Sequence, residues 1–112
     1  MQLPQEGTLL RVFIGEADKH EGKPLYEWIV LKAREQGLAG ATVLRGMMGF
    51  GAKTRQIHTF RFDTLSEDLP IIVEIVDTSE KLTQFLEIID PHIQAGLVTI
   101  EKAQIKVYRF EP

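Results

Sequence analysis

The chain has 112 residues, no cysteine and a formal net charge of −3 at pH 7. This length fits one domain with a real hydrophobic core over residues 1–112, and the absence of cysteine excludes disulfides, thiolate nucleophiles and cysteine-ligated zinc. The negative charge, with no face rich in Lys and Arg, argues against nucleic acid as a partner.

The N-terminal sequence MQLPQEG has neither a cationic start nor an apolar core, so it does not have the pattern of a secretory signal. No apolar run approaches the roughly 20 residues that a helix needs to cross a bilayer. We therefore expect a cytoplasmic protein without a membrane span.

The first half of the chain predicts a strand, a helix and a second strand. Thr8–Gly15 is rich in β-branched and aromatic residues and ends in glycine, which is typical of a strand. Pro24 suits the first turn of a helix, and apolar residues recur at helical spacing over Leu25–Gln36 until Gly37 ends the helix. The second strand runs from Ala41 to about Gly49.

The second half repeats this order. Gln56–Asp63 alternates in part and extends a hairpin, while Leu69–Asp77 has the strongest strand pattern of the chain. Asp77 is placed to cap the next helix, with Glu80 three residues later as the acidic part of a capping box. The helix carries a stripe of apolar residues at Leu82, Phe85, Leu86, Ile89 and Ile93.

The second helix is interrupted at Pro91 and ends at Gly96, and Leu97–Phe110 forms a final strand. The order of elements is then strand, helix, strand, strand, helix, strand. This order predicts an α+β, ferredoxin-like βαββαβ sandwich, with a four-stranded antiparallel sheet and two helices on one face.

Apolar side chains occur on both faces of the predicted sheet. Leu9 and Phe13 on the first strand, and Ile72 and Val76 on the third, lie on the face opposite the helices. In a sheet with one face in water, apolar and polar residues alternate more regularly along each strand than they do here. We therefore expect the second face of this sheet to be covered by other copies of the chain.

The candidate functional segment is ATVLRGMMGFGAKTRQIH, residues 41–58. Its glycines allow positive φ angles and close approach of a ligand to the main chain, and the neighbouring cations suit a phosphate. The residues assigned to this nucleotide or phosphate site are Arg45, Gly46, Gly49, Gly51, Lys53, Arg55 and His58. Glycines in a hairpin loop are also common where they only allow the chain to turn. The residue types therefore leave both a ligand site and a simple turn open.

Standard nucleotide motifs are not met. Gly46 and Gly51 have the separation of G-x-x-x-x-G, but Ala52 stands where a P-loop requires lysine, and a strand-like segment follows. The dinucleotide pattern G-x-G-x-x-G does not occur. The three histidines, His20, His58 and His92, lie in different segments without metal-ligand spacing, so a solvated or hydrogen-bonded role is favoured for each.

The segments GKPLYEWIVLKAREQGLAGATVLRGMMGFG, IHT, LSEDLPIIVEIVD and GLVTIEKAQIKVYR together resemble the PII-like proteins grouped as domain of unknown function 190. The resemblance covers about residues 8 to 110. It implies a trimeric signalling protein related to the nitrogen-regulatory PII proteins, with an adenine nucleotide (AMP, ADP or ATP) in clefts between subunits. It also implies that the loop Gly49–Ser66 contacts a partner, which genomic association in this group indicates to be a membrane transporter or channel.

The same resemblance implies that the cleft is lined by the Arg45–Gly51 block, the start of the second helix and the C-terminal strand of a neighbouring subunit. On that strand, Arg109 either binds a phosphate across the subunit boundary or is a surface residue of an edge strand. The sequence departs from true PII proteins in two respects: the loop has no tyrosine that matches the uridylylation target, and Thr78–Lys81 replaces the Lys- and Gly-rich phosphate turn.

We expect a regulator that needs no cofactor and is not an enzyme. One alternative is a divalent-metal tolerance or sensing trimer, with ligands from His58 or His92 and carboxylates across a subunit boundary. A second is a small ferredoxin-like enzyme, which requires a cavity between helices and sheet. Trp28, Phe85 and Leu86 are expected to fill that space.

Overall fold

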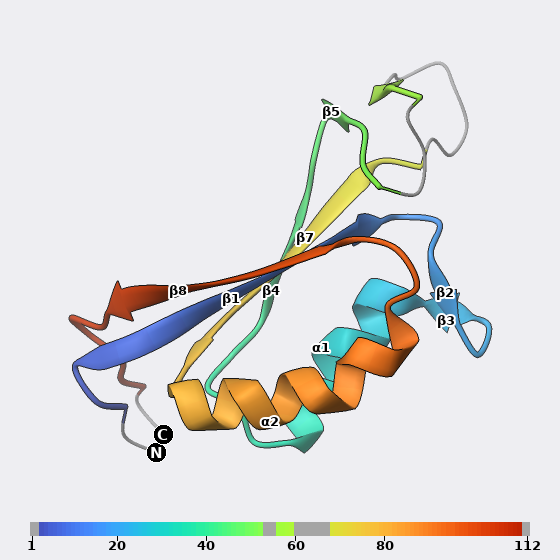
Figure 1. The fold of residues 1–112 in the computed structure, drawn as a ribbon. Helices are drawn as coiled ribbons and strands as arrows, with labels where there is room; N and C mark the ends of the chain where they lie inside the picture. Colours follow the sequence, from blue (N-terminus) through green and yellow to red (C-terminus); the bar gives the residue numbers. More distant parts are fainter. Residues whose placement is uncertain (1–2, 53–55, 60–67, 111–112) are drawn as a thin grey trace.

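The computed structural model describes residues 3–52, 56–59 and 68–110, and it confirms the predicted ferredoxin-like arrangement (Figure 1). Four antiparallel strands form the sheet in the order β4-β7-β1-β8. The strands are β1 (Glu6–Gly15), β4 (Thr42–Arg45), β7 (Pro70–Asp77) and β8 (Leu97–Gln104). The helices α1 (Leu25–Glu35) and α2 (Ser79–Ile89) lie together below the sheet in Figure 1.

Three short elements complete the described chain. The pair β2 (Lys19–His20) and β3 (Lys23–Pro24) forms a small hairpin between β1 and α1, and a 3-10 turn, η1 (Asp90–His92), follows α2 at Pro91 as the sequence predicts. The pair β5 (Met48–Gly49) and β6 (His58–Thr59) lies beyond the end of the main sheet, away from the helices (Figure 1).

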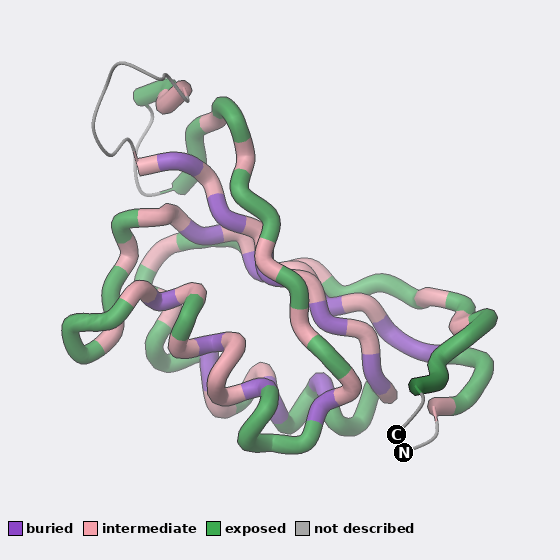
Figure 2. The backbone as a smooth tube through the Cα atoms, turned by 180° about the vertical axis from the view of Figure 1, so that it is seen from behind, coloured by how far each residue is buried: buried purple, intermediate pink, exposed green. Residues whose placement is uncertain are grey.

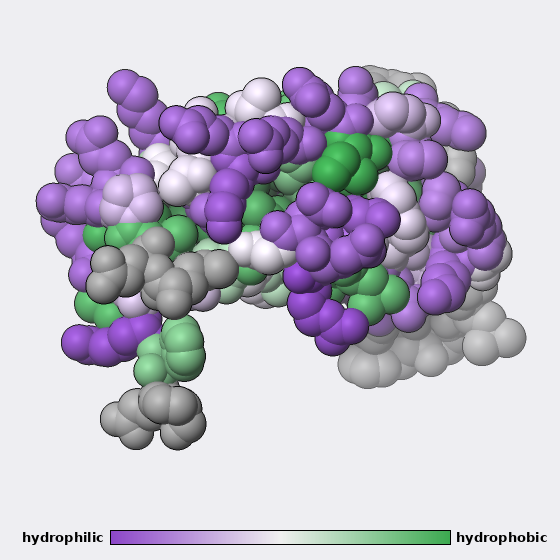
Figure 3. Space-filling model, turned by 90° about the horizontal axis from the view of Figure 1, so that it is seen from below, coloured by the Kyte–Doolittle hydropathy of each residue, from purple (hydrophilic) through white to green (hydrophobic). Residues whose placement is uncertain are grey.

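The hydrophobic core lies between the sheet and the two helices. Alternate residues of β1 and β7 are buried, as the period of a strand requires when one face packs on helices (Figure 2). The helices contribute buried residues at helical spacing. The largest buried apolar side chains are Leu10, Ile29, Leu69, Ile75, Leu82, Phe85 and Ile89. Hydrophilic side chains predominate on the outer surface on the helix side (Figure 3).

Three sequence predictions about element ends were wrong. The second helix ends at Ile89 and is followed by the 3-10 turn η1, so it does not extend to Gly96. Thr78, and not Asp77, is the N-cap of α2: its Oγ1 accepts a hydrogen bond from the Lys81 N–H at 3.2 Å. Asp77 is fully buried and accepts hydrogen bonds from the backbone N–H groups of Ala39 (2.8 Å) and Thr78 (2.7 Å). The sequence predicted that the Asp77 carboxylate caps α2, whereas in the structure this carboxylate binds the backbone N–H of Ala39.

The last strand is also shorter than predicted, because β8 ends at Gln104. Its partner β1 begins at Glu6, opposite Gln104, so there is no strand for residues 105–110 to pair with. The Ile105 N–H continues the register of this pair by one residue, donating to the Gln5 carbonyl at 2.6 Å. Beyond it, the Tyr108 hydroxyl donates to the Ala39 carbonyl at 2.8 Å.

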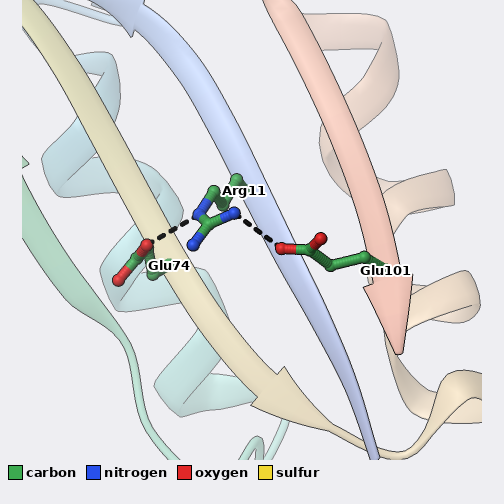
Figure 4. A network of polar contacts seen from close by, with 3 residues as sticks. All are labelled: Arg11, Glu74 and Glu101. Carbon is green, nitrogen blue, oxygen red and sulfur yellow. Dashed lines mark hydrogen bonds and ion pairs between the residues drawn. The ribbon is translucent and has the colours of Figure 1, made fainter. Parts of the chain in front are cut away.

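The sheet face opposite the helices, which we call the open face, has a charged centre with apolar residues around it. At the centre, Arg11 donates from Nε to Glu74 at 2.8 Å and from Nη1 to Glu101 at 2.6 Å (Figure 4). The hydrogen bond to Glu74 and the charge of Glu101 raise the pKa of the Arg11 guanidinium above its ordinary value. The surrounding apolar residues are Leu9, Phe13, Leu44, Ile72, Val76 and Leu97. Leu44 is 44% exposed and Leu97 57% exposed, so both contact water in a single chain.

Candidate functional site

The ends of the loop between β4 and β7 meet at Pro70. The Gly46 N–H donates to the Pro70 carbonyl at 2.7 Å, and this bond follows directly on the pairing of β4 with β7. A Cβ atom at position 46 would lie 2.7 Å from Cγ of Pro70, so the close approach of the two segments requires glycine. The predicted strand over residues 41–49 is accordingly divided into β4 and β5 at this contact.

The loop glycines do not use the positive φ angles that their residue type allows. Gly22, Gly37 and Gly96 are the described glycines with positive φ, and Gly46, Gly49 and Gly51 are not among them. Gly49 lies against the Pro70 ring, where an added Cβ would be 3.2 Å from Cγ, whereas an added Cβ on Gly51 would have no neighbour within 4 Å among the residues that the structure describes.

A pocket of about 460 Å³ lies at the base of this loop. Its walls come from the end of β1, from both sides of the loop, and from the turn that precedes β8. The lining residues in these three regions are Phe13, Ile14, Gly15, Gly49, Phe50, Gly51, Ala52, His58, Asp68, Pro70, Ala95, Gly96 and Leu97. Most of the lining is apolar, His58 and Asp68 are its titratable side chains, and no Lys or Arg is present among its described residues.

Gly96 brings the turn before β8 against β1 on one side of this pocket. Its φ is 155°, and a Cβ at this position would lie 2.5 Å from the carbonyl oxygen of Phe13. No other residue type fits such a backbone contact without displacing one of the two segments. The sequence identified Gly96 only as the end of the second helix.

The turn between β1 and β2 holds both ends of the loop. Glu16 forms an ion pair with Arg45, the last residue of β4, with 3.0 Å between Arg45 Nε and Glu16 Oε2 and 3.4 Å between Arg45 Nη2 and Glu16 Oε1. The Glu16 N–H donates to the Leu69 carbonyl at 2.8 Å, and the Ala17 N–H donates to Asp68 Oδ1 at 2.8 Å. The positive charge of Arg45 is therefore already matched by a carboxylate.

The structure brings together only part of the predicted site. Gly49, Gly51 and His58 line the pocket, with Gly46 and Arg45 in the adjoining stem. Lys53 and Arg55 lie outside the described residues.

Arg109 follows Tyr108, which is bonded to Ala39 before the start of β4, at the opposite end of the sheet from the loop (Figure 1). The start of α2 is at that far end too, so the pocket is lined by the turn after α2 and not by the start of that helix. Within one chain, Arg109 is therefore separate from the other assigned residues.

Sequence reasoning missed the residues that the fold brings to the site from other elements. Phe13 faces the pocket from β1, Glu16 reaches Arg45, and Asp68 lies over Gly15, where an added Cβ would be 2.6 Å from Asp68 Oδ1. Asp68 belongs to SEDLP, a motif that the family resemblance includes, so the sequence carried a signal for this residue. Its contact with Ala17 joins residues 51 positions apart, and no local sequence pattern predicts such a contact.

Two of the histidines, although distant in sequence, lie side by side in the structure. His20, Trp28 and His92 form a compact cluster with ring centroids 4.3 to 4.8 Å apart, joining the β2–β3 hairpin, α1 and η1. Among residues 3–52, 56–59 and 68–110, no group of three or more His, Asp or Glu side chains is arranged to hold a metal ion.

The space between helices and sheet is packed. Phe85 is 1% exposed within the core, and Trp28 and Leu86 pack against the same cluster, as the sequence predicts. In the part of the chain that the structure describes, no helix is both long and apolar enough to cross a membrane.

The chain belongs to the DUF190 family, described as "Uncharacterized ACR, COG1993", whose pattern matches residues 7–105. A UPF0166 protein of Aquifex aeolicus is 42% identical over 97 residues, covering 87% of this chain and 90% of the relative. A UPF0166 protein of Methanocaldococcus jannaschii is 36% identical over 81 residues, covering 72% of this chain and 73% of the relative. The predicted family resemblance is thus confirmed.

The fold is similar to that of solved PII-like proteins. CPII of Thiomonas intermedia K12, bound to ADP and bicarbonate, superposes with a TM-score of 0.63 at 19% identity, covering 89% of this chain and 88% of CPII. CPII bound to ADP, AMP and bicarbonate, where it is described as a nitrogen regulatory PII-like protein, gives a TM-score of 0.67 at 18% identity, with the same coverage of both chains. At this level of identity the likeness establishes the PII-like fold.

Proposed function

We propose that this DUF190 protein is a PII-like signalling regulator that binds an adenine nucleotide at the base of its β4–β7 loop and controls a partner through that loop. The observation that carries the proposal is the pocket of about 460 Å³, because its walls belong partly to the loop and partly to the rigid sheet. A ligand that contacts both parts restricts the loop relative to the sheet. Such ordering of a segment by a bound nucleotide is an established kind of switch.

The chemistry of the pocket suits the base of the nucleotide better than its phosphates. Phe13, Phe50 and Leu97 provide apolar and aromatic surface for a purine ring, whereas Asp68 repels an anion. The phosphates are assigned to the stem of the loop, where Arg45 lies beside the pocket that His58 lines. Lys53 and Arg55 stay phosphate ligands predicted from the sequence alone. The structures of CPII with ADP and AMP support the ligand class by likeness of fold.

The proposal includes a trimer in which the open faces pack together. This face carries six apolar residues around the Arg11 network, and no described helix or strand of the same chain covers it. Within one chain Arg109 lies at the other end of the sheet from the loop, so we assign it to the site of a neighbouring chain in this trimer. The partner implied by the family resemblance, a membrane transporter or channel, is the proposed target of the loop.

Isothermal titration calorimetry with ADP, AMP and ATP tests the ligand. Replacing Arg45 with alanine should weaken ADP binding by about tenfold or more, because a charge-assisted hydrogen bond to phosphate contributes about 1.5–3 kcal/mol. The matched control is Arg34→Ala, which removes the same charge from an exposed position on α1. Absence of heat with all three nucleotides, or equal losses in the two variants, would contradict the assignment.

Sedimentation velocity at micromolar concentration tests the assembly. Ile72→Glu places a charge among the apolar residues of the open face and should give monomers, while Gln84→Glu adds the same charge to the exposed side of α2 and should leave the trimer intact. A wild-type protein that sediments as a monomer would refute assembly through this face.

A further inference from the structure

The contact between Glu16 and Arg45 has the geometry with which arginine holds a phosphate. Two guanidinium nitrogens, Nε and Nη2, face the two carboxylate oxygens at 3.0 and 3.4 Å. This edge of the guanidinium binds carboxylates and phosphates in the same planar, two-point manner. The Arg45 side chain is 51% exposed and that of Glu16 is 26% exposed, so an anion in solution can reach the pair.

Glu16 is also fixed in place by the backbone. Its own N–H is bonded to the Leu69 carbonyl, and the turn around it is closed by bonds from the Gly15 N–H to Asp18 Oδ2 (3.0 Å) and from the Asp18 N–H to the Gly15 carbonyl (3.2 Å). The carboxylate is therefore presented to Arg45 by an ordered turn, and that turn also contacts Asp68 and Leu69 at the far end of the loop.

We propose that Glu16 is an internal ligand of Arg45, which a phosphate group must displace in order to bind there. This inference rests on the proposed function and concerns the regulation of the same site. Because Glu16 and a phosphate compete for the same edge of the guanidinium, Glu16 weakens binding of every anion at Arg45 and favours ligands with several negative charges. Displacement also removes the link between the β1–β2 turn and the β4 end of the loop, while the links to Asp68 and Leu69 remain.

The test measures binding of ADP and of inorganic pyrophosphate, a probe without a base, to wild type and to Glu16→Gln by calorimetry. Removing an exposed ion pair should tighten binding of both ligands by about 1.4- to 5-fold, the equivalent of about 0.2–1 kcal/mol. Glu16→Ala should shift the affinities in the same direction. Glu21→Gln, which removes an equal charge from an exposed position of the same β1–α1 connection, should leave both affinities unchanged.

The decisive comparison repeats Glu16→Gln in the Arg45→Ala background. Competition for Arg45 predicts no gain there, whereas simple repulsion between Glu16 and the ligand predicts the same gain in both backgrounds. Wild-type affinity in Glu16→Gln and Glu16→Ala, or an equal gain without Arg45, overturns the internal-ligand proposal and leaves nucleotide binding standing. Failure of wild type and Glu16→Gln to bind either probe overturns both proposals.

Discussion

Replacing Gly46 with alanine tests how the loop is joined to the sheet. The added Cβ would lie 2.7 Å from Cγ of Pro70 and 3.4 Å from its carbonyl oxygen, whereas carbon atoms in contact are normally about 3.5–4.0 Å apart. Pro70 cannot easily move away, because it is paired with Gly15 of β1 and accepts the Gly46 N–H. Overpacking of this kind costs about 1–3 kcal/mol, and losing the 2.7 Å hydrogen bond adds about 0.5–1.5 kcal/mol if the stem opens.

Urea unfolding at a fixed protomer concentration measures this loss, since the stability of an oligomer depends on concentration. The matched control is Gly51→Ala, in the same loop, where an added Cβ has no described neighbour within 4 Å and φ is not positive. It should be neutral or gain up to about 1 kcal/mol through the lower entropy of the unfolded chain. Equal effects of the two substitutions would refute the close approach of Gly46 and Pro70 as the cause.

Three further substitutions test other parts of the structure. Phe85→Ala should lower the free energy of unfolding by about 3–5 kcal/mol in the same assay, because it empties a site in the core that is 1% exposed; a loss below about 1 kcal/mol would contradict that packing. Thr78→Ala should cost about 0.5–2 kcal/mol through loss of the α2 cap, and an unchanged unfolding curve would argue against the cap. Arg11→Gln leaves Glu74 and Glu101 without their cation on the open face and should raise the concentration at which the proposed trimer dissociates, as measured by sedimentation; unchanged dissociation would place this network outside the proposed interface.

Local patterns were sufficient to predict the fold. β-Branched and aromatic residues located β1, the strong strand pattern of Leu69–Asp77 located β7, and helical spacing located α1 and α2. Pro91 marked the interruption that follows α2, whereas the predicted helix end at Gly96 was wrong. The errors occurred where a distant residue decides the outcome. Asp and Thr are both residue types that cap helices, and in the structure Thr78 caps α2 while Asp77 accepts a bond from Ala39, 38 residues away.

The candidate site was less predictable for the same reason. The glycine and cation pattern indicated a segment that partly lines the pocket, but charge counted along the sequence did not show that Glu16, 29 residues before Arg45, neutralises it. Asp68 was likewise outside the assigned set, although it lines the pocket. Composition indicated a cationic loop, whereas the described residues form an apolar pocket with one paired arginine beside it.

The contacts at the loop base determine which parts of the molecule can respond to a ligand. The strand that follows the loop, β7, continues into the core through Ile71 and Val73, which are 2% and 0% exposed, so a shift of this strand would disturb close packing. The links that join the loop to the β1–β2 turn are instead an ion pair exposed to water and two hydrogen bonds. Because such links open at much lower cost than core contacts, ligand binding at Arg45 should alter the loop and this turn while α1, α2 and the sheet keep their positions. Hydrogen exchange with and without ADP should then differ in residues 15–18 and 46–52 and stay constant in β1 and β7, and changes spread across the sheet would contradict this division.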